Sequence, residues 1–193
     1  MGSDYLLALL KRRLIAGDPP EVPGEMMASV AIALDKEGSL RTLMIKRAER
    51  NLDPWSGQVA FPGGRREPQD ESLVETAIRE TREEVEIDLA RSARYLGHLG
   101  TFRTHTGTML VVPCVFVLRR KDRVRPNAEV ASFRWIPVEA FFREKSKSMY
   151  YLERGGAREW LPAYVYRDYV IWGLTYRMIS FLVGREKSPI RPR

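Results

Sequence analysis

Residues 61 to 87 read FPGGRREPQDESLVETAIRETREEVEI, and this stretch decides the fold. A Gly-Gly turn leads through a short polar segment into a sequence with helical periodicity. In that helix Glu80, Glu83 and Glu84 stand at positions i, i+3 and i+4, so their carboxylates share one face. Like charges gathered on one face repel each other. A hard divalent cation that prefers oxygen ligands, such as Mg²⁺, therefore suits this face.

The helix is predicted from about residue 71 to residue 87, and Asp70 or Ser72 suits its N-cap. The residues expected to face the core follow helical spacing: Leu73, Val74, Ala77, Ile78, Thr81 and Val85. The three glutamates fall on roughly the opposite side, which predicts that they point into a cleft or into solvent. A solvated face held by ion pairs at i, i+4 is the alternative to a cation site. The glycines before the helix favour the cation site, because glycine lets the backbone approach a ligand closely.

The composition indicates one globular domain spanning residues 1–193, of which 44% are apolar. No run approaches 18 apolar residues, so no membrane span is expected, and the N-terminus lacks the apolar stretch of a signal peptide, which favours the cytoplasm. Cys114 is the only cysteine, so an internal disulfide is excluded, and its apolar neighbours predict burial. Asparagine and glutamine together number four beside 30% charged residues, a composition typical of thermophiles.

The formal net charge of +7 is compatible with two kinds of anionic partner. One is a nucleic acid, and the other is a small polyanion such as a nucleotide or a diphosphate. The sequence lacks the interleaved aromatic and basic residues of a nucleic-acid module, so no nucleic-acid partner is expected.

The remaining segments predict a mixed α/β domain in which a sheet lies between helices. An amphipathic N-terminal helix is expected at about residues 4–16 and a C-terminal helix at about residues 166–184. Strands are expected at residues 27–34, 40–47, 59–61, 95–102, 109–119 and 131–136, followed by a short helix at residues 138–145.

At this point the sequence resembles a known family. Residues 64–87 are similar to the Nudix box, G-x5-E-x7-R-E-U-x-E-E-x-G-U with U aliphatic, because Arg79 begins the Arg-Glu-x-x-Glu-Glu segment and Glu71 lies eight residues before it. Two positions depart from the pattern. The loop from Gly64 to Glu71 is one residue longer, and Glu86 replaces a glycine. We expect this replacement to change the end of the helix and to leave the acidic face intact.

Further motifs resemble the coenzyme A pyrophosphatase subfamily of Nudix enzymes. They lie between residues 43 and 183 and comprise residues 47–64, 106–113, 127–137 and 171–175. The resemblance implies the Nudix fold, an α/β/α sandwich with a mixed sheet. It also implies hydrolysis of coenzyme A or a derivative to 4'-phosphopantetheine and adenosine 3',5'-bisphosphate. The alternatives are a hydrolase of ADP-ribose, a dinucleotide or a nucleoside triphosphate, and a non-catalytic module that binds nucleotide or RNA. Nudix enzymes are often dimers, so the resemblance also allows a homodimer.

The resemblance assigns roles within the acidic helix. Glu80, Glu83 and Glu84 would coordinate Mg²⁺ or Mn²⁺ together with the Gly64 carbonyl, and Glu80 would accept the proton of the attacking water. Arg79 would orient the glutamates through Glu71 or Glu83.

Three residues outside the helix are further candidates for the site. Glu129, in a predicted loop, is a second candidate for the general base, with plain surface charge as its alternative. Arg47 and Arg50 follow a strand close to the Gly-Gly turn. They are either solvated surface residues or contacts to the substrate phosphates, which suit the forked guanidinium group.

Overall fold

The structure, a computed structural model, describes residues 2–50, 55–120, 122–154 and 157–186. Its centre is a mixed sheet built around two parallel strands, β1 (Met27–Asp35) and β7 (Leu110–Leu118), paired from Met27 opposite Leu110 to Leu34 opposite Val117. Every residue of β7 is buried, as its continuous apolar sequence predicts for a central strand. The other strands of this sheet are β2 (Arg41–Arg47), β3 (Val59–Ala60), β4 (Gly63–Arg65), β5 (Ala93–His98), β6 (Phe102–Arg103) and β8 (Val130–Pro137).

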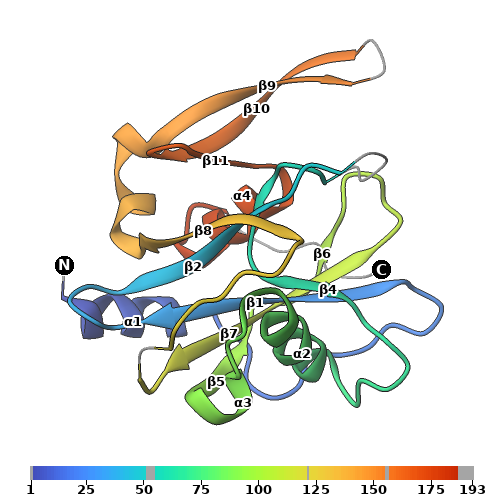
Figure 1. The fold of residues 1–193 in the computed structure, drawn as a ribbon. Helices are drawn as coiled ribbons and strands as arrows, with labels where there is room; N and C mark the ends of the chain where they lie inside the picture. Colours follow the sequence, from blue (N-terminus) through green and yellow to red (C-terminus); the bar gives the residue numbers. More distant parts are fainter. Residues whose placement is uncertain (1, 51–54, 121, 155–156, 187–193) are drawn as a thin grey trace.

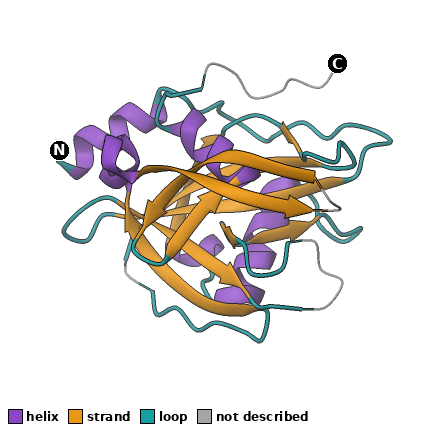
Figure 2. Cartoon of the chain, turned by 90° about the horizontal axis from the view of Figure 1, so that it is seen from above, coloured by secondary structure: helices purple, strands orange, loops and turns teal. Residues whose placement is uncertain are grey.

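Helices cover both faces of this sheet, so the predicted α/β sandwich is confirmed (Figures 1 and 2). The helix α2 (Leu73–Val85) packs on one face, against alternate residues of β1 such as Ala31 and Ala33. The helices α1 (Ser3–Lys11) and α4 (Gly173–Leu182) pack on the other face, where the intervening residue Ile32 points. Because successive side chains of a strand point to opposite faces of the sheet, β1 contributes to the apolar clusters on both faces. The short helix α3 (Leu89–Ser92) follows α2.

The structure also contains a second, three-stranded antiparallel sheet, which the sequence did not predict. It contains β9 (Lys147–Arg154), β10 (Ala157–Tyr166) and β11 (Tyr169–Trp172), in the order β11-β10-β9. In Figure 1 the β9–β10 hairpin rises away from the larger sheet.

Three predicted helices differ from the structure. The N-terminal helix ends at Lys11 and does not reach residue 16. The C-terminal helix starts at Gly173, because the residues after 166 first form a turn with Arg167 at φ 56° and then β11. The helix predicted at residues 138–145 is a pair of 3₁₀ segments, η1 (Val138–Phe142) and η2 (Glu144–Ser146).

Two other sequence-based expectations concern burial and membrane spans. The Cys114 side chain is fully buried, as predicted. Burial raises the pKa of its thiol to about 11. Within the described ranges, no helix is both long and apolar enough to cross a membrane.

Candidate active site

The acidic helix α2 places its three glutamates in three different environments. Ser72 caps the helix by accepting a hydrogen bond from the Glu75 N–H at 3.2 Å. The exposed fraction of the side chain is 51% for Glu83, 17% for Glu80 and only 4% for Glu84. As expected from the sequence, these glutamates point into a cleft or into solvent: Glu83 is exposed, and Glu80 and Glu84 line a pocket, in which Glu84 is almost fully covered. The reason is β4, which crosses this side of the helix and donates the Gly63 N–H to Glu84 Oε2 at 2.9 Å.

Two glycines make this close crossing possible. At Gly63, with φ 155°, a Cβ atom would lie 2.4 Å from the backbone oxygen of Ser29, so no side chain fits there. At Gly64 a Cβ atom would lie 2.4 Å from Glu80 Oε1. The Glu80 carboxylate therefore lies where a side chain at position 64 would be. Because glycine has no side chain, the backbone of β4 lies directly against the acidic face of α2.

Arg79 is the cation that holds the acidic cluster together. Its guanidinium group donates to both carboxylate oxygens of Asp70, at 2.9 and 3.0 Å. It also donates to Glu80 at 3.0 Å and to Glu83 at 3.2 Å. A further hydrogen bond of 3.0 Å goes to the Arg65 carbonyl of β4. This bidentate and branched geometry suits the arginine fork and could not be made by lysine.

Asp70 has the place that the sequence analysis gave to Glu71. Its buried carboxylate accepts hydrogen bonds from the Glu67 N–H and the Thr76 hydroxyl, both at 2.9 Å, besides those from Arg79. The Arg79 hydrogen bonds hold the pKa of Asp70 at about 2, against the opposing effect of burial. Glu71 is exposed, and its backbone N–H donates to Glu75. The available signal in the sequence was a short acidic side chain in the turn before the helix.

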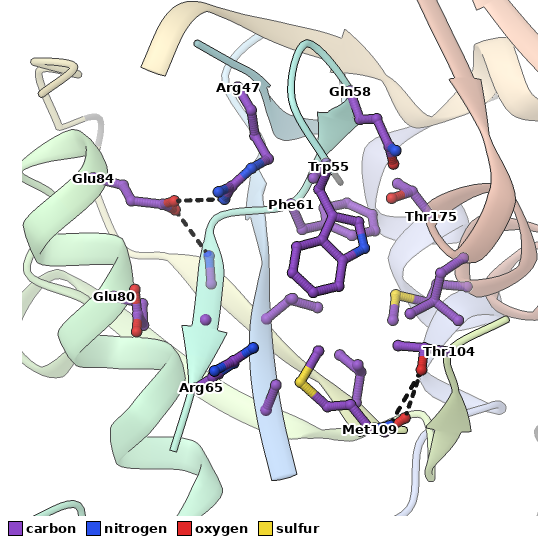
Figure 3. A pocket seen from close by; sticks show the side chains of 18 of the residues that line it. Arg47, Trp55, Gln58, Phe61, Arg65, Glu80, Glu84, Thr104, Met109 and Thr175 are labelled. Carbon is purple, nitrogen blue, oxygen red and sulfur yellow. Dashed lines mark hydrogen bonds and ion pairs between the residues drawn. The ribbon is translucent and has the colours of Figure 1, made fainter. Parts of the chain in front are cut away.

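A pocket of about 370 Å³ opens beside α2 and β4 (Figure 3). Charged groups gather on one side of it, where the carboxylates of Glu80 and Glu84 face the arginines Arg47 and Arg65. The opposite wall is largely apolar and comes from the 55–61 segment, β1, β7 with the residue before it, and α4: Trp55, Phe61, Val30, Met109, Val111, Leu174 and Met178. Gln58, Thr104 and Thr175 add polar groups to that wall. Sequence reasoning had missed Arg65, Trp55 and the methionines, because helical or strand periodicity carries no signal for a wall built from four separate segments.

The pocket brings together two of the three further candidates from the sequence. Arg47 ends β2 and lies 3.8 Å from Glu84, and Glu129 also lines the pocket. Arg50 lies outside the pocket wall and pairs with Glu129 at 3.0 Å on the exposed surface. The Glu129 carbonyl accepts the N–H of Ala48, the residue after β2, at 2.8 Å. The loop before β8 therefore forms one rim of the pocket.

Burial makes these carboxylates easier to protonate than free ones. It raises the pKa of Glu84 to about 7, although the Gly63 hydrogen bond acts in the opposite direction. It also raises the pKa of Glu80, against the effect of the nearby Arg79. Both carboxylates therefore lie where an added positive charge is strongly favoured.

The carboxylate and backbone oxygens of this pocket suit a hard divalent cation, although they are not arranged around one point in this structure. Among the residues that the structure describes, no three His, Cys, Asp or Glu side chains converge on one point. Glu80 and Glu84 both face the pocket, beside the peptide backbone of β4. Glu83 is held by Arg79, so it must leave this ion pair before it can join a cation site.

The comparisons with known proteins agree with this geometry. The model of the NUDIX domain matches residues 25–156. Nudix hydrolase NudL of Yersinia enterocolitica, named as uncharacterized, is 38% identical over 145 residues, 73% of this chain and 72% of that protein. Peroxisomal coenzyme A diphosphatase ndx-8 of Caenorhabditis elegans is 37% identical over 149 residues, 75% of this chain and 63% of that protein.

A solved structure supports the fold alone. The MutT/nudix family protein from Enterococcus faecalis superimposes with a TM-score of 0.50 at 17% identity, over 89% of this chain and 58% of that one.

Proposed function

Because the chain belongs to the Nudix hydrolase family, we propose that it is a diphosphohydrolase that depends on Mg²⁺ or Mn²⁺ and cleaves coenzyme A or a derivative. Nudix hydrolases act on small nucleotide derivatives and generally depend on a divalent metal. The proposal adds the identity of the metal, the substrate and the roles of individual residues.

The observation that carries the proposal is the division of the pocket into a charged side and an apolar side. A diphosphate that joins two organic groups needs cationic and metal-binding groups at its centre and less polar walls beside it. Arg47 and Arg65 lie next to Glu80 and Glu84 on the charged side, where the phosphate oxygens would lie. The apolar wall around Trp55 would then take one of the two organic groups of the substrate.

The reaction requires attack of water on one phosphorus atom and departure of the other phosphate. A bound Mg²⁺ or Mn²⁺ would neutralise the diphosphate and lower the pKa of a bound water. Glu80, Glu84 and the Gly64 carbonyl would hold it, joined by Glu83 after its release from Arg79. Glu80 would accept the water proton while the water oxygen bonds to phosphorus and the bridging P–O bond breaks.

The surrounding residues have supporting roles in this proposal. Arg79 would hold Glu80 and Glu83 in position, itself fixed by Asp70 in place of the Glu71 expected from the sequence. Arg47 would contact the substrate phosphates, and Glu129, on the rim, is the second candidate for the general base. Arg50 would act indirectly, by fixing Glu129.

The choice of coenzyme A rests on the worm relative named as a coenzyme A diphosphatase, together with the apolar wall. The test is to incubate the protein with Mg²⁺ or Mn²⁺ and a panel of substrates: coenzyme A, acyl-coenzyme A, ADP-ribose, NADH, diadenosine polyphosphates and 8-oxo-dGTP. Products are identified by mass. We expect 4'-phosphopantetheine, or its acyl form, and adenosine 3',5'-bisphosphate. In water enriched in oxygen-18 the label would appear in one product only and identify the attacked phosphorus.

Matched variants connect the activity to the pocket. Glu80→Gln and Glu84→Gln each remove one pocket carboxylate and should lower kcat by at least about a hundredfold. Glu71→Gln removes an exposed carboxylate just before the same helix and should leave kcat close to that of the unmodified protein. A kcat/KM more than about tenfold higher for ADP-ribose than for coenzyme A would reject the assignment of coenzyme A as the substrate. If no substrate of the panel is turned over with either metal, the proposal that this protein is an enzyme is rejected, and a nucleotide-binding module is favoured.

A further inference from the structure

The hairpin β9–β10 ends the smaller sheet with an uncovered edge. The sheet order is β11-β10-β9, and within the described part of the chain β9 pairs with β10 alone. Figure 1 shows the β9–β10 hairpin extending away from the larger sheet. An edge strand of eight residues, paired on one side only among the described strands, offers its outward N–H and C=O groups to another strand.

The two faces of this hairpin differ in what covers them. On one face Tyr150 stacks on Trp172 of β11, with ring centroids 4.5 Å apart. On the other face Met149 and Tyr151 of β9 are 52% and 41% exposed, and Trp160 of β10 is 63% exposed. Trp160 is directly opposite Tyr151 in the register, with ring centroids 5.1 Å apart. Two aromatic rings and a methionine thus form an exposed apolar face beside the free edge.

We propose that a second copy of this chain pairs with the free edge, β9 against β9, in antiparallel orientation about a two-fold axis through Tyr150. In this register Met149 lies opposite Tyr151 of the second copy. Lys147 lies opposite Glu153 of the second copy, and the same pair recurs on the other side of the axis. The two three-stranded sheets then become one six-stranded sheet with the apolar face continuous across its centre.

Charge complementarity selects this register. Opposite residues of an antiparallel pair share a face, so the register can only shift in steps that keep odd-numbered residues opposite odd-numbered ones. One such shift puts Lys147 opposite Tyr151, and the other puts Glu153 opposite Met149. Only the proposed register pairs the two charges that flank the apolar centre. In the single chain Lys147 and Glu153 have exposed ion pairs, to Glu144 at 2.8 Å and to Arg158 at 3.5 Å, which are weak.

The symmetry also accounts for the exposed edge in physical terms. A two-fold pairing buries the same edge of both copies and leaves neither β9 open to a third chain. Cross-strand contacts between aromatic and aliphatic side chains, together with pairs of opposite charge, are the contacts that stabilise such strand pairing. The proposal is independent of the proposed reaction, because no described residue of β9 or β10 lines the pocket.

The test is the oligomeric state of the full chain, measured by sedimentation velocity over micromolar concentrations. We expect a dimer. Lys147→Glu places like charges opposite each other at two sites and should weaken the dimer by at least about tenfold in Kd. Glu153→Lys should do the same, and the double variant, in which the charges are exchanged, should restore dimer formation. Lys145→Glu makes the same charge change at an exposed position just before β9 and should leave the dimer intact.

A second variant addresses the apolar centre. Trp160→Ser removes an exposed ring and should also weaken the dimer while the circular dichroism spectrum stays unchanged. A monomeric unmodified protein at the highest concentration would overturn the proposal and leave the edge to an extended peptide from another protein. A dimer that Lys147→Glu does not weaken, or that the exchanged pair does not restore, would equally overturn it.

Discussion

Arg79 shows how a single side chain organises the acidic helix before any cation is bound. It contacts Asp70, Glu80 and Glu83, and it also reaches the Arg65 carbonyl of β4. The sequence pattern identified Arg79 and offered Glu71 or Glu83 as its partner; Arg79 contacts Glu83, and Asp70 stands where Glu71 was expected. Asp70 takes that place because its short side chain is buried at the turn before the helix and also bonds to Thr76. Spacing along the chain does not indicate which of two adjacent carboxylates turns inward.

The first prediction separates these two neighbours. Asp70→Asn leaves Arg79 without its bidentate partner and should lower the free energy of unfolding by about 2–4 kcal/mol. It should also lower kcat/KM by about 10–100-fold, because Arg79 then holds Glu80 and Glu83 less firmly. Glu71→Gln should change both quantities little. Chemical denaturation and steady-state kinetics measure the two effects, and equal effects of the two substitutions would contradict this assignment.

The pH dependence of the same pair has a defined sign. The Arg79 hydrogen bonds hold the pKa of Asp70 at about 2 in the folded protein, below the value of 3.8 for an unperturbed aspartate. Its contribution, about 2 kcal/mol, is therefore complete above about pH 4 and is lost as the pH falls through about 2. In Asp70→Asn that part of the acid-induced loss of stability should be missing. An unchanged acid profile would show that Asp70 is not held in its charged form.

The two adjacent glycines give a second prediction with two different outcomes. Gly64→Ala puts a methyl group where the Glu80 carboxylate lies, and a flexible side chain can move away from it. We therefore expect a folded protein with lowered kcat. Gly63→Ala instead meets the backbone of Ser29 and Val30, at a positive φ, and should lose several kcal/mol of stability. Melting temperatures and kinetics measured on both variants test this, and the reverse order of effects would refute it.

At the scale of the secondary-structure elements, α2 ends differently from what its sequence suggested. The replacement of the usual glycine by Glu86 was expected to change the helix end, and this expectation is wrong. Glu86 adopts the left-handed conformation, with φ 57° and ψ 25°, that favours glycine. Its backbone N–H donates to the Arg82 carbonyl, and its side chain pairs with Arg125 at 3.1 Å. The loop that bears Arg125 docks on this helix end, with Asn127 N–H bonded to the Glu84 carbonyl, and holds the turn.

The third prediction follows from this strained cap. Glu86→Gly relieves the steric cost of the left-handed conformation and loses an exposed ion pair of small value. Glycine also costs more entropy on folding, so the net gain should be at most about 1 kcal/mol, or roughly 2–4 °C in Tm. Glu86→Ala keeps the strain without the ion pair and should not exceed the unmodified protein. Calorimetry distinguishes the variants, and a lower Tm for Glu86→Gly would show that the Arg125 pair dominates.

The elements that sequence patterns predicted are those with a single, strong period. The strand β7 is apolar throughout and α2 has one apolar stripe, and both were correctly placed. The β9–β10 hairpin was missed because much of it is exposed, so its side chains do not alternate between core and solvent. The predicted start of the C-terminal helix, at residue 166, is too early, because Tyr169 and Ile171 fit the pattern of a strand as well as that of a helix. The positive φ of Gly173, at 63°, marks the change from one to the other.

At the scale of the whole molecule, the proposed cation site predicts a link between metal binding in the pocket and the stability of the fold. A ligand that binds only the folded state stabilises it by about 2.7 kcal/mol at a hundred times its Kd. Saturating Mg²⁺ or Mn²⁺ should therefore raise the Tm by roughly 5–10 °C. The bound positive charge offsets the unfavourable free energy of burying the charged carboxylates of Glu80 and Glu84. Glu84→Gln should lose most of this shift, whereas Glu71→Gln should keep it. An equal shift in both variants, measured by differential scanning fluorimetry, would place the cation elsewhere.

The pocket draws its charged side mainly from α2 and β4, and its apolar wall from other segments of the chain. Mutations in Trp55, Met109 or Met178 therefore leave the acidic helix and its Arg79 contacts untouched. Such independence is a condition for evolvability, because a descendant gene can acquire a new substrate without rebuilding its chemistry. If the proposed roles hold, the same separation offers protein engineers a constant acidic helix and a variable apolar wall, and a library at the three wall positions would explore substrate range.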